Sequence, residues 1–123
     1  MTESKIQQSI IQYLSMLASQ KKFVFFSVPN ESLMMVLTVF KVHKNICYRI
    51  VSFFKKMGLL PGVSDIIIIH GGKAYFIEVK TDSGTQSQDQ VRFEHNVNAS
   101  GCPYEVVRSV SDVIGVLGEW GIM

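Results

Sequence analysis

One stretch decides the fold: residues 64–80, with the sequence SDIIIIHGGKAYFIEVK. Two runs of β-branched and aromatic residues flank Gly71-Gly72, and such runs around a Gly-Gly pair are typical of a β-hairpin with a two-residue loop. Counting outward from this loop predicts that Asp65 lies directly opposite Glu78, with their Cβ atoms roughly 4.5–5.5 Å apart. The sequence therefore predicts a hairpin whose open end carries two facing carboxylates.

The open end of this hairpin also carries a cation on the same face. Because side chains alternate along a strand, Glu78 and Lys80 point to one side, and Asp65 converges with them. Two facing carboxylates on hydrophobic strands repel each other and need a compensating cation. The sequence places no cysteine or histidine pair nearby. The two acids are therefore expected to bind a hard ion that prefers oxygen ligands, Mg²⁺ or Mn²⁺.

This combination of two acids and a lysine indicates a metal-dependent nuclease. Lys80 would then stabilise a phosphate or help to activate a water. The alternative is purely structural: Asp65 begins its strand at a solvated edge, and Glu78 and Lys80 form an ordinary surface pair. Short motifs of this kind recur without function, so this stretch alone leaves both interpretations open.

Length and composition place the chain among globular proteins. A length of 123 residues predicts a single domain over 1–123. A hydrophobic fraction of 47% with 18% charged residues excludes a disordered chain. The net charge is only +2, so any affinity for nucleic acid depends on where the cations lie rather than on their number.

The sequence predicts a soluble, cytoplasmic protein that does not associate with membranes. Cys47 and Cys102 are the only cysteines and lack metal-binding spacing, so free thiols in a reducing compartment are expected. The N-terminus lacks the pattern of a signal peptide. The longest apolar run is far shorter than the roughly 20 residues needed to span a bilayer.

Periodicity and turn signals predict an α/β fold with helices on both faces of a central mixed sheet. Helices are expected at 2–19, 40–57, 87–100 and from Ser111 onward, with Thr2 capping the first helix and Ser111 capping the last. Strands are expected at 22–28, 64–70, 73–80 and 104–108. The pattern over 33–39 is ambiguous. The helix at 87–100 would connect two parallel neighbouring strands, and Ser87 with Gln90 three residues later has the spacing of a capping box.

The helix expected at 40–57 has two contrasting faces. One arc is apolar and includes His43, which we interpret as a core histidine. The opposite arc holds cations without any acidic residue: Lys41, Lys44, Arg49, Lys55 and Lys56. Since such a face lacks the i, i+4 ion pairs of an ordinary solvated helix, it indicates a surface that binds nucleic-acid phosphates. A lysine-rich face that only solvates the helix explains the pattern equally well.

Several short motifs occur together in an order that resembles one nuclease family. They are Glu3 on the first helix, Val28-Pro29-Asn30-Glu31 after the first strand, Gly62-Val63-Ser64-Asp65, Glu78-Val79-Lys80, Ser87-Gln88-Asp89-Gln90 and Gly101 before the last strand. The chain resembles a stand-alone VRR-NUC domain of the PD-(D/E)XK nuclease superfamily over nearly its whole length. The resemblance implies a restriction-endonuclease-like sheet. Ser64 stands where the family usually has proline.

The resemblance implies a role for each matching residue. Glu3, Asp65 and Glu78 would ligate or orient the metal, together with the backbone carbonyl of Val79. Lys80 would be catalytic. Gln90 would project toward the same site, although its capping-box role explains this residue equally well.

The resemblance also implies a substrate and an assembly. Stand-alone members look like resolvases that cut four-way DNA junctions as homodimers, since symmetric cutting of two strands needs two sites. A nuclease for flaps or nicked duplexes is an alternative. A module that binds nucleic acid without cutting it, through the basic face at 40–57, is a further alternative, which the intact acidic pair disfavours.

Overall fold

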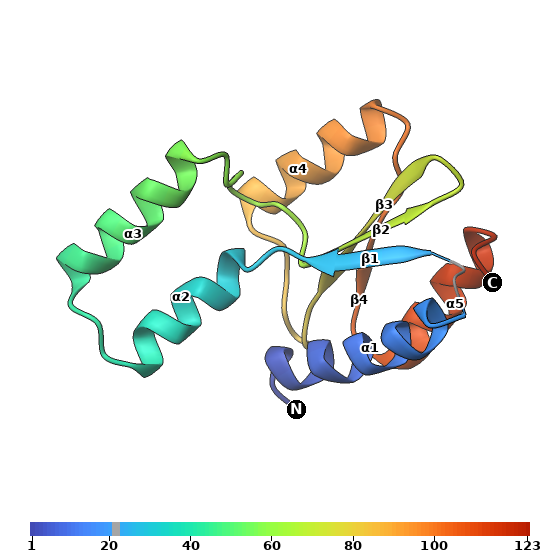
Figure 1. The fold of residues 1–123 in the computed structure, drawn as a ribbon, viewed down its shortest axis with the longest axis horizontal. Coiled ribbons are helices and arrows are strands. Elements are labelled where there is room, and N and C mark those ends of the chain that lie inside the picture. The colour runs from blue at the N-terminus through green and yellow to red at the C-terminus, as the bar shows by residue number, and fades with distance from the viewer. Residues whose placement is uncertain (21–22) are drawn as a thin grey trace.

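The computed structural model describes residues 1–20 and 23–123. Across these residues the chain forms five helices and a four-stranded mixed sheet (Figure 1). In chain order the elements are α1 (Glu3–Ala18), β1 (Val24–Ser27), α2 (Asn30–Val39), α3 (Lys44–Lys56), β2 (Ile66–His70), β3 (Lys73–Val79), α4 (Gln88–Ala99), β4 (Tyr104–Val107) and α5 (Val110–Glu119). The expected start of the first strand at Lys22 lies outside the described residues.

The sheet has the strand order β1-β2-β3-β4. β2 runs antiparallel to both β1 and β3, and β4 runs parallel to β3. The predicted hairpin is confirmed: His70 pairs with Lys73, and Gly71 and Gly72 have the positive φ angles, 57° and 79°, that this tight loop requires. The ladder ends with Ile66 opposite Ile77, and one further step places Asp65 against Glu78.

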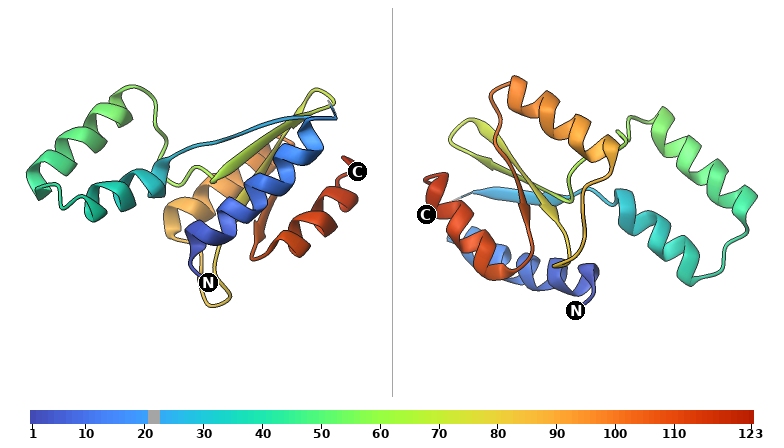
Figure 2. Two further views of the ribbon diagram at one scale, coloured as in Figure 1. Left: turned by 60° about the horizontal axis from the view of Figure 1, so that its bottom comes forward. Right: turned by 180° about the vertical axis from the view of Figure 1, so that it is seen from behind.

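Helices cover both faces of the sheet, as predicted. α1 and α5 lie side by side on one face, where Ile10 and Leu117 join the buried core around Ile77 (Figure 2). α4 lies on the other face and packs Phe93 edge-on against Phe76 of β3, with ring centroids 5.2 Å apart. The α/β class with a mixed central sheet is therefore established, and this arrangement agrees with a restriction-endonuclease-like fold.

The segment between β1 and β2 differs from the prediction. Instead of one helix over 40–57, the chain forms α2, turns at residues 40–43, and forms α3. Lys41 has a left-handed backbone with φ 54°, and His43 caps α3 by accepting the amide of Asn45 on its Nδ1 atom at 3.2 Å. His43 is exposed, so its interpretation as a core histidine is wrong. By accepting a backbone N–H that has no partner within the helix, the His43 imidazole marks the start of α3. The single helix that periodicity predicted over 40–57 is therefore interrupted at this residue.

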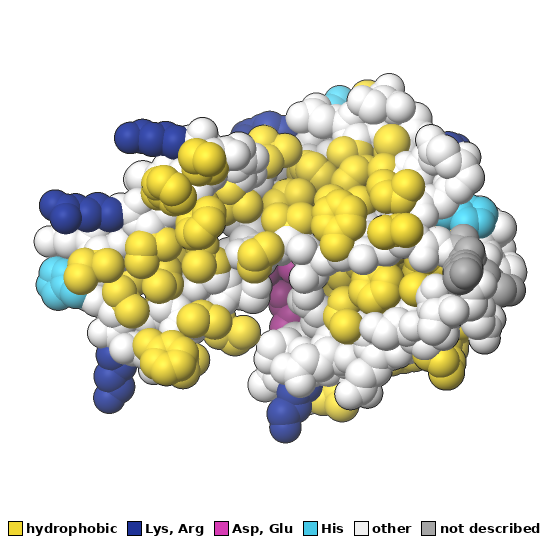
Figure 3. All heavy atoms as spheres, in the orientation of Figure 1, with side chains coloured by type: hydrophobic (Ala, Val, Ile, Leu, Met, Phe, Trp, Pro, Cys, Tyr) yellow, Lys and Arg dark blue, Asp and Glu magenta, His cyan; other side chains and the backbone are white. Residues whose placement is uncertain are grey.

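α2 and α3 form an arm that projects from the sheet and its packed helices, which we call the body (Figures 1 and 2). Leu37 is the only buried residue of these two helices. The apolar side of α3 is exposed, for example Ile46 at 50% and Phe53 at 57%. Figure 3 shows apolar side chains spread over the arm and the neighbouring sheet, with acidic side chains visible between them.

Among the helices of residues 1–20 and 23–123, none combines the length and the apolar character needed to cross a membrane.

Candidate metal centre

Four carboxylates meet where the arm joins the body. They come from Glu3 in the first turn of α1, Glu31 in the first turn of α2, Asp65 just before β2, and Glu78 on β3. One oxygen from each lies within 4.8 Å of the others. The sequence predicted Glu3, Asp65 and Glu78 for this site. Glu31 was not assigned to it, although it belongs to the Val28-Pro29-Asn30-Glu31 motif.

Asp65 and Glu78 form the buried floor of the centre. Glu78 is fully buried and Asp65 is 8% exposed. The Oδ2 atom of Asp65 accepts a hydrogen bond of 2.7 Å from the backbone amide of Val79, which fixes the position of this carboxylate. The Oε1 atom of Glu78 is buried and has no hydrogen-bond partner among the described residues. A buried carboxylate oxygen without a partner is costly unless a cation meets it, so the donor set fits a hard metal ion.

The electrostatics of the centre reflect this crowding. Burial, followed by the negative charge of Asp65, raises the pKa of Glu78 to about 10. Burial also raises the pKa of Asp65. Burial, followed by a hydrogen bond with Glu31, raises the pKa of Glu3 to about 7. Without a metal the centre therefore retains protons at neutral pH, and a divalent cation would displace them.

Lys80 is the cation of this centre. Its Nζ atom lies 3.7 Å from Oε2 of Glu78 and 3.9 Å from Oε1 of Glu31, and its side chain is only 8% exposed. Glu78 and Lys80 lie on the same side of the sheet, as strand alternation predicted. Within residues 1–20 and 23–123, Lys80 is the one lysine or arginine that makes ion pairs with these carboxylates, so they outnumber their cations.

Gln90 fills both of the roles that the sequence left open. Its Oε1 atom accepts the amide of Ser87 at 2.9 Å, which completes the capping box of α4. Its Nε2 atom donates to Glu31 and, at 3.2 Å, to Glu78. A side-chain amide has separate donor and acceptor atoms, so one glutamine both starts a helix and orients two carboxylates.

The loop before Asp65 reaches the centre by passing close to the start of α4. Gly62 has a φ of 82°, and a Cβ atom at this position would lie 2.2 Å from the backbone oxygen of Asp89. Only glycine allows this approach. Ser64 is fully buried and donates from Oγ to the carbonyl of Ile66 at 3.3 Å, and this hydrogen bond restrains the backbone just before β2.

Val79 contributes to the centre through its backbone. Its amide holds Asp65, and its side chain is fully buried in the core. That its carbonyl also binds a metal stays a prediction.

The cations predicted to bind nucleic acid all lie on the arm and are exposed: Lys41, Lys44, Arg49, Lys55 and Lys56. Lys41 lies in the turn before α3, so it does not share the helical face on which it was placed. Lys55 lines a groove of about 250 Å³ together with Glu31 and Gln90, next to the carboxylates. Within residues 1–20 and 23–123, none of these five cations forms an ion pair with an acidic side chain.

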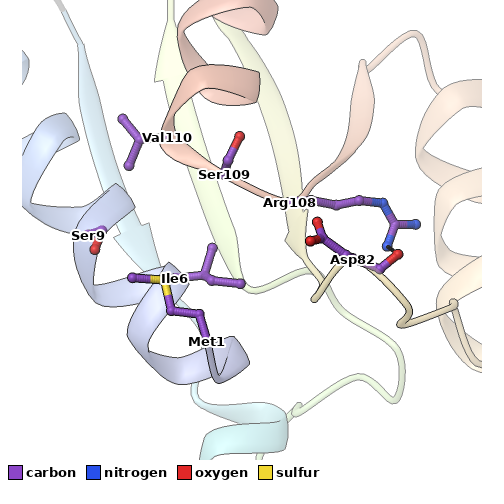
Figure 4. Close-up of a pocket in the computed structure, with 7 residues that line it drawn as sticks. All are labelled: Met1, Ile6, Ser9, Asp82, Arg108, Ser109 and Val110. Carbon is purple, nitrogen blue, oxygen red and sulfur yellow. Dashed lines mark hydrogen bonds between the residues drawn. The ribbon is translucent and has the colours of Figure 1, made fainter.

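A second cleft, of about 350 Å³, lies at the start of α1 (Figure 4). Its lining includes Asp82 and Arg108 but none of the four carboxylates. The guanidinium of Arg108 donates to the backbone carbonyls of Thr81, Asp82 and Gly84. Arg108 thereby holds the loop that directly follows Lys80, and its charge is used within the fold.

Comparisons of the chain with models of known families, with curated proteins and with solved structures give no match. The resemblance to VRR-NUC domains therefore stays a prediction from the motifs.

Proposed function

We propose that this chain is a metal-dependent nuclease that hydrolyses phosphodiester bonds in DNA. The observation that carries the proposal is an oxygen of the fully buried Glu78 that has no hydrogen-bond partner in the described part of the chain. It lies among three other carboxylates, with Lys80 beside them. A purely structural acid–lysine pair would lie at the surface or satisfy both carboxylate oxygens. A site with excess negative charge and oxygen ligands favours Mg²⁺ or Mn²⁺.

The residues of this centre have distinct roles in the proposed reaction. Glu3, Asp65 and Glu78 would hold the metal. A divalent cation supplies a Lewis acid that polarises the phosphate and promotes attack by water. Lys80 lies beside the same carboxylates and would offset the negative charge that develops on the phosphate oxygens. Gln90 keeps the Glu78 carboxylate oriented through its amide.

The arm would guide the DNA backbone toward this centre. Lys55 supports this role, because it lines the groove that also contains Glu31 and Gln90. Lys44, Arg49 and Lys56 lie on the same helix and are exposed. Cations without acidic partners are available to neutralise phosphates.

A branched DNA substrate and a homodimer belong to the same proposal. Cutting both strands of a junction needs two centres, and the described part of one chain carries one set of four carboxylates. Light scattering on the purified protein measures its mass directly. A mass of one chain at all concentrations, with DNA bound and without, would contradict the homodimer.

We also infer a cytoplasmic location. Cys47 and Cys102 are both free, which supports a reducing compartment. Cell fractionation tests this inference.

The decisive experiment incubates the protein with labelled four-way junction, flap, duplex and single-stranded DNA, each with Mg²⁺, Mn²⁺ or EDTA. Cleavage of the junction with metal, absent in EDTA and in the Glu78→Gln variant, is expected. Glu119→Gln is a matched control, because it removes one exposed carboxylate on α5, away from the centre. Binding without cleavage of any substrate would contradict the nuclease and favour the non-catalytic binding module.

A further inference from the structure

Glu31 has a special place in the structure because it belongs to the arm and yet reaches the centre. It lies in the first turn of α2, directly after the chain leaves β1. Its polar partners, Gln90 and Lys80, both belong to the body. The other three carboxylates come from α1 or from the strands of the body.

Little else fixes the arm to the body. α3 has no buried residue, and α2 has one. The arm returns to the body through a loop that begins at Gly58, whose φ of 107° is a conformation that glycine adopts readily. The position of the arm therefore depends strongly on the contacts of Glu31, because extensive packing is missing.

We propose that Glu31 is a fourth metal ligand, and that metal binding through Glu31 fixes the arm and its Lys55 beside the centre. This inference rests on the proposed metal centre and adds a regulatory role to it. Metal binding would then restrain the cation that lines the groove.

The charges explain why metal would act on the arm rather than on the body. Without metal, the Glu31 carboxylate lies with three other carboxylates whose oxygens are within 4.8 Å of one another, and each of them that is ionised repels it. A divalent cation reverses the sign of this interaction. Asp65 and Glu78 are buried and held by the sheet, whereas the Glu31 side chain is 48% exposed. Metal binding would therefore change the position of Glu31 and of α2, which carries it, more than the positions of Asp65 and Glu78.

The unpartnered oxygen of Glu78 is independent evidence that the centre receives a ligand. It is fully buried within the same group of carboxylates, and Gln90 binds its other oxygen while also binding Glu31. The side-chain amide of Gln90 thus holds the Glu31 carboxylate of the arm beside the buried carboxylate of Glu78.

Hydrogen exchange read by mass spectrometry tests the inference without relying on activity. In the wild type, saturating Mg²⁺ should slow amide exchange over α2 and α3 by about tenfold. In Glu31→Gln this protection should be lost, because a neutral amide is a weaker ligand, while calorimetry should still detect Mg²⁺ binding with about tenfold lower affinity. Glu119→Gln should behave like the wild type in both measurements.

The outcomes separate this inference from the proposed function. If the wild type binds Mg²⁺ and the exchange of the arm is unchanged, or if Glu31→Gln keeps the protection, the inference is overturned and the metal centre stands. If the wild type binds neither Mg²⁺ nor Mn²⁺, both proposals fail. Thermal unfolding in EDTA verifies that Glu31→Gln is folded, and Glu31→Asp, which keeps the charge on a shorter side chain, should retain part of the protection.

Discussion

α1 and α3 are both amphipathic helices, but the apolar side of α1 is packed in the core whereas that of α3 is exposed. Four apolar residues of α1 are buried in the core, including Ile10 and Leu14 with no exposed surface. Burial of such a side chain contributes about 1.5–3 kcal/mol. α3 gains no comparable contribution, because none of its residues is buried. The body is therefore the rigid part that holds the buried carboxylates, and the arm is the part that carries exposed cations.

Under the proposed function, this contrast would assign the chemical step to the body and DNA binding to the arm. Substitutions in the body should abolish cleavage and leave DNA affinity nearly unchanged. Substitutions on the arm should weaken affinity and leave the chemical step intact. Cleavage and affinity measured on the same variants test this separation.

The largest effect is expected for the buried carboxylates. Asp65→Ala and Glu78→Ala should each reduce cleavage by more than about 10³-fold, since they would remove two of the proposed metal ligands. Binding of junction DNA should persist, and the metal-free variants should unfold at an equal or higher temperature because like-charge repulsion is relieved. Cleavage at the wild-type rate by either variant, with Glu119→Ala as the matched control, would contradict the assigned site.

Lys80 should affect turnover rather than affinity. Lys80→Ala is expected to lower single-turnover cleavage by about 10²–10⁴-fold, the range of a positioned catalytic group. Equilibrium binding should change little, because the buried lysine offers little surface to free DNA. A variant that loses only affinity would show that Lys80 makes a simple phosphate contact.

The arm should show the reverse behaviour. Replacing both Lys44 and Lys55 with alanine should reduce the slope of log affinity against log salt on duplex DNA by about 0.9 for each phosphate that is no longer neutralised. Cleavage of saturated substrate should remain intact. Lys73→Ala is the control, since Lys73 is an exposed lysine at the hairpin loop of the body. An unchanged slope would mean that the arm's cations only solvate their helix.

The smallest expected effect is a pH dependence of stability in the body. The pKa values of Glu78 and Glu3 are raised to about 10 and about 7, so between the unfolded value of 4.5 and these values the folded state holds more protons than the unfolded state. Stability should therefore fall as pH rises, and the midpoint of thermal unfolding in EDTA should be lower at pH 9 than at pH 6 by an amount on the order of 10 °C.

Two comparisons check the origin of this pH dependence. Glu78→Gln should flatten it, because the neutral amide needs no proton, and saturating Mg²⁺ should reduce it in the wild type. An equal fall with pH in Glu78→Gln would place the responsible group elsewhere.

Local chemistry was enough to predict much of the body. The hairpin around Gly71-Gly72, the cap of α1 at Thr2 and the capping box of Ser87 with Gln90 are all present as expected. Each depends on residues that are neighbours in the chain. The start of α5 differs from the prediction by two residues, because Ser109 caps the helix instead of Ser111. The Ser109 hydroxyl accepts the backbone N–H of Asp112, and the Asp112 carboxylate accepts the backbone N–H of Arg108.

The sequence by itself determined the register of the β2–β3 hairpin, and with it the placement of Asp65 against Glu78 and of Lys80 on the same face as Glu78, because strand alternation and a two-residue loop leave one solution. Only the tertiary structure decided that the 40–57 segment breaks at His43, that the apolar side of α3 stays exposed, and that Glu31 joins the carboxylates. These features depend on the contacts between the arm and the body. Helical periodicity predicts which residues share one face of a helix, but it does not predict what packs against that face.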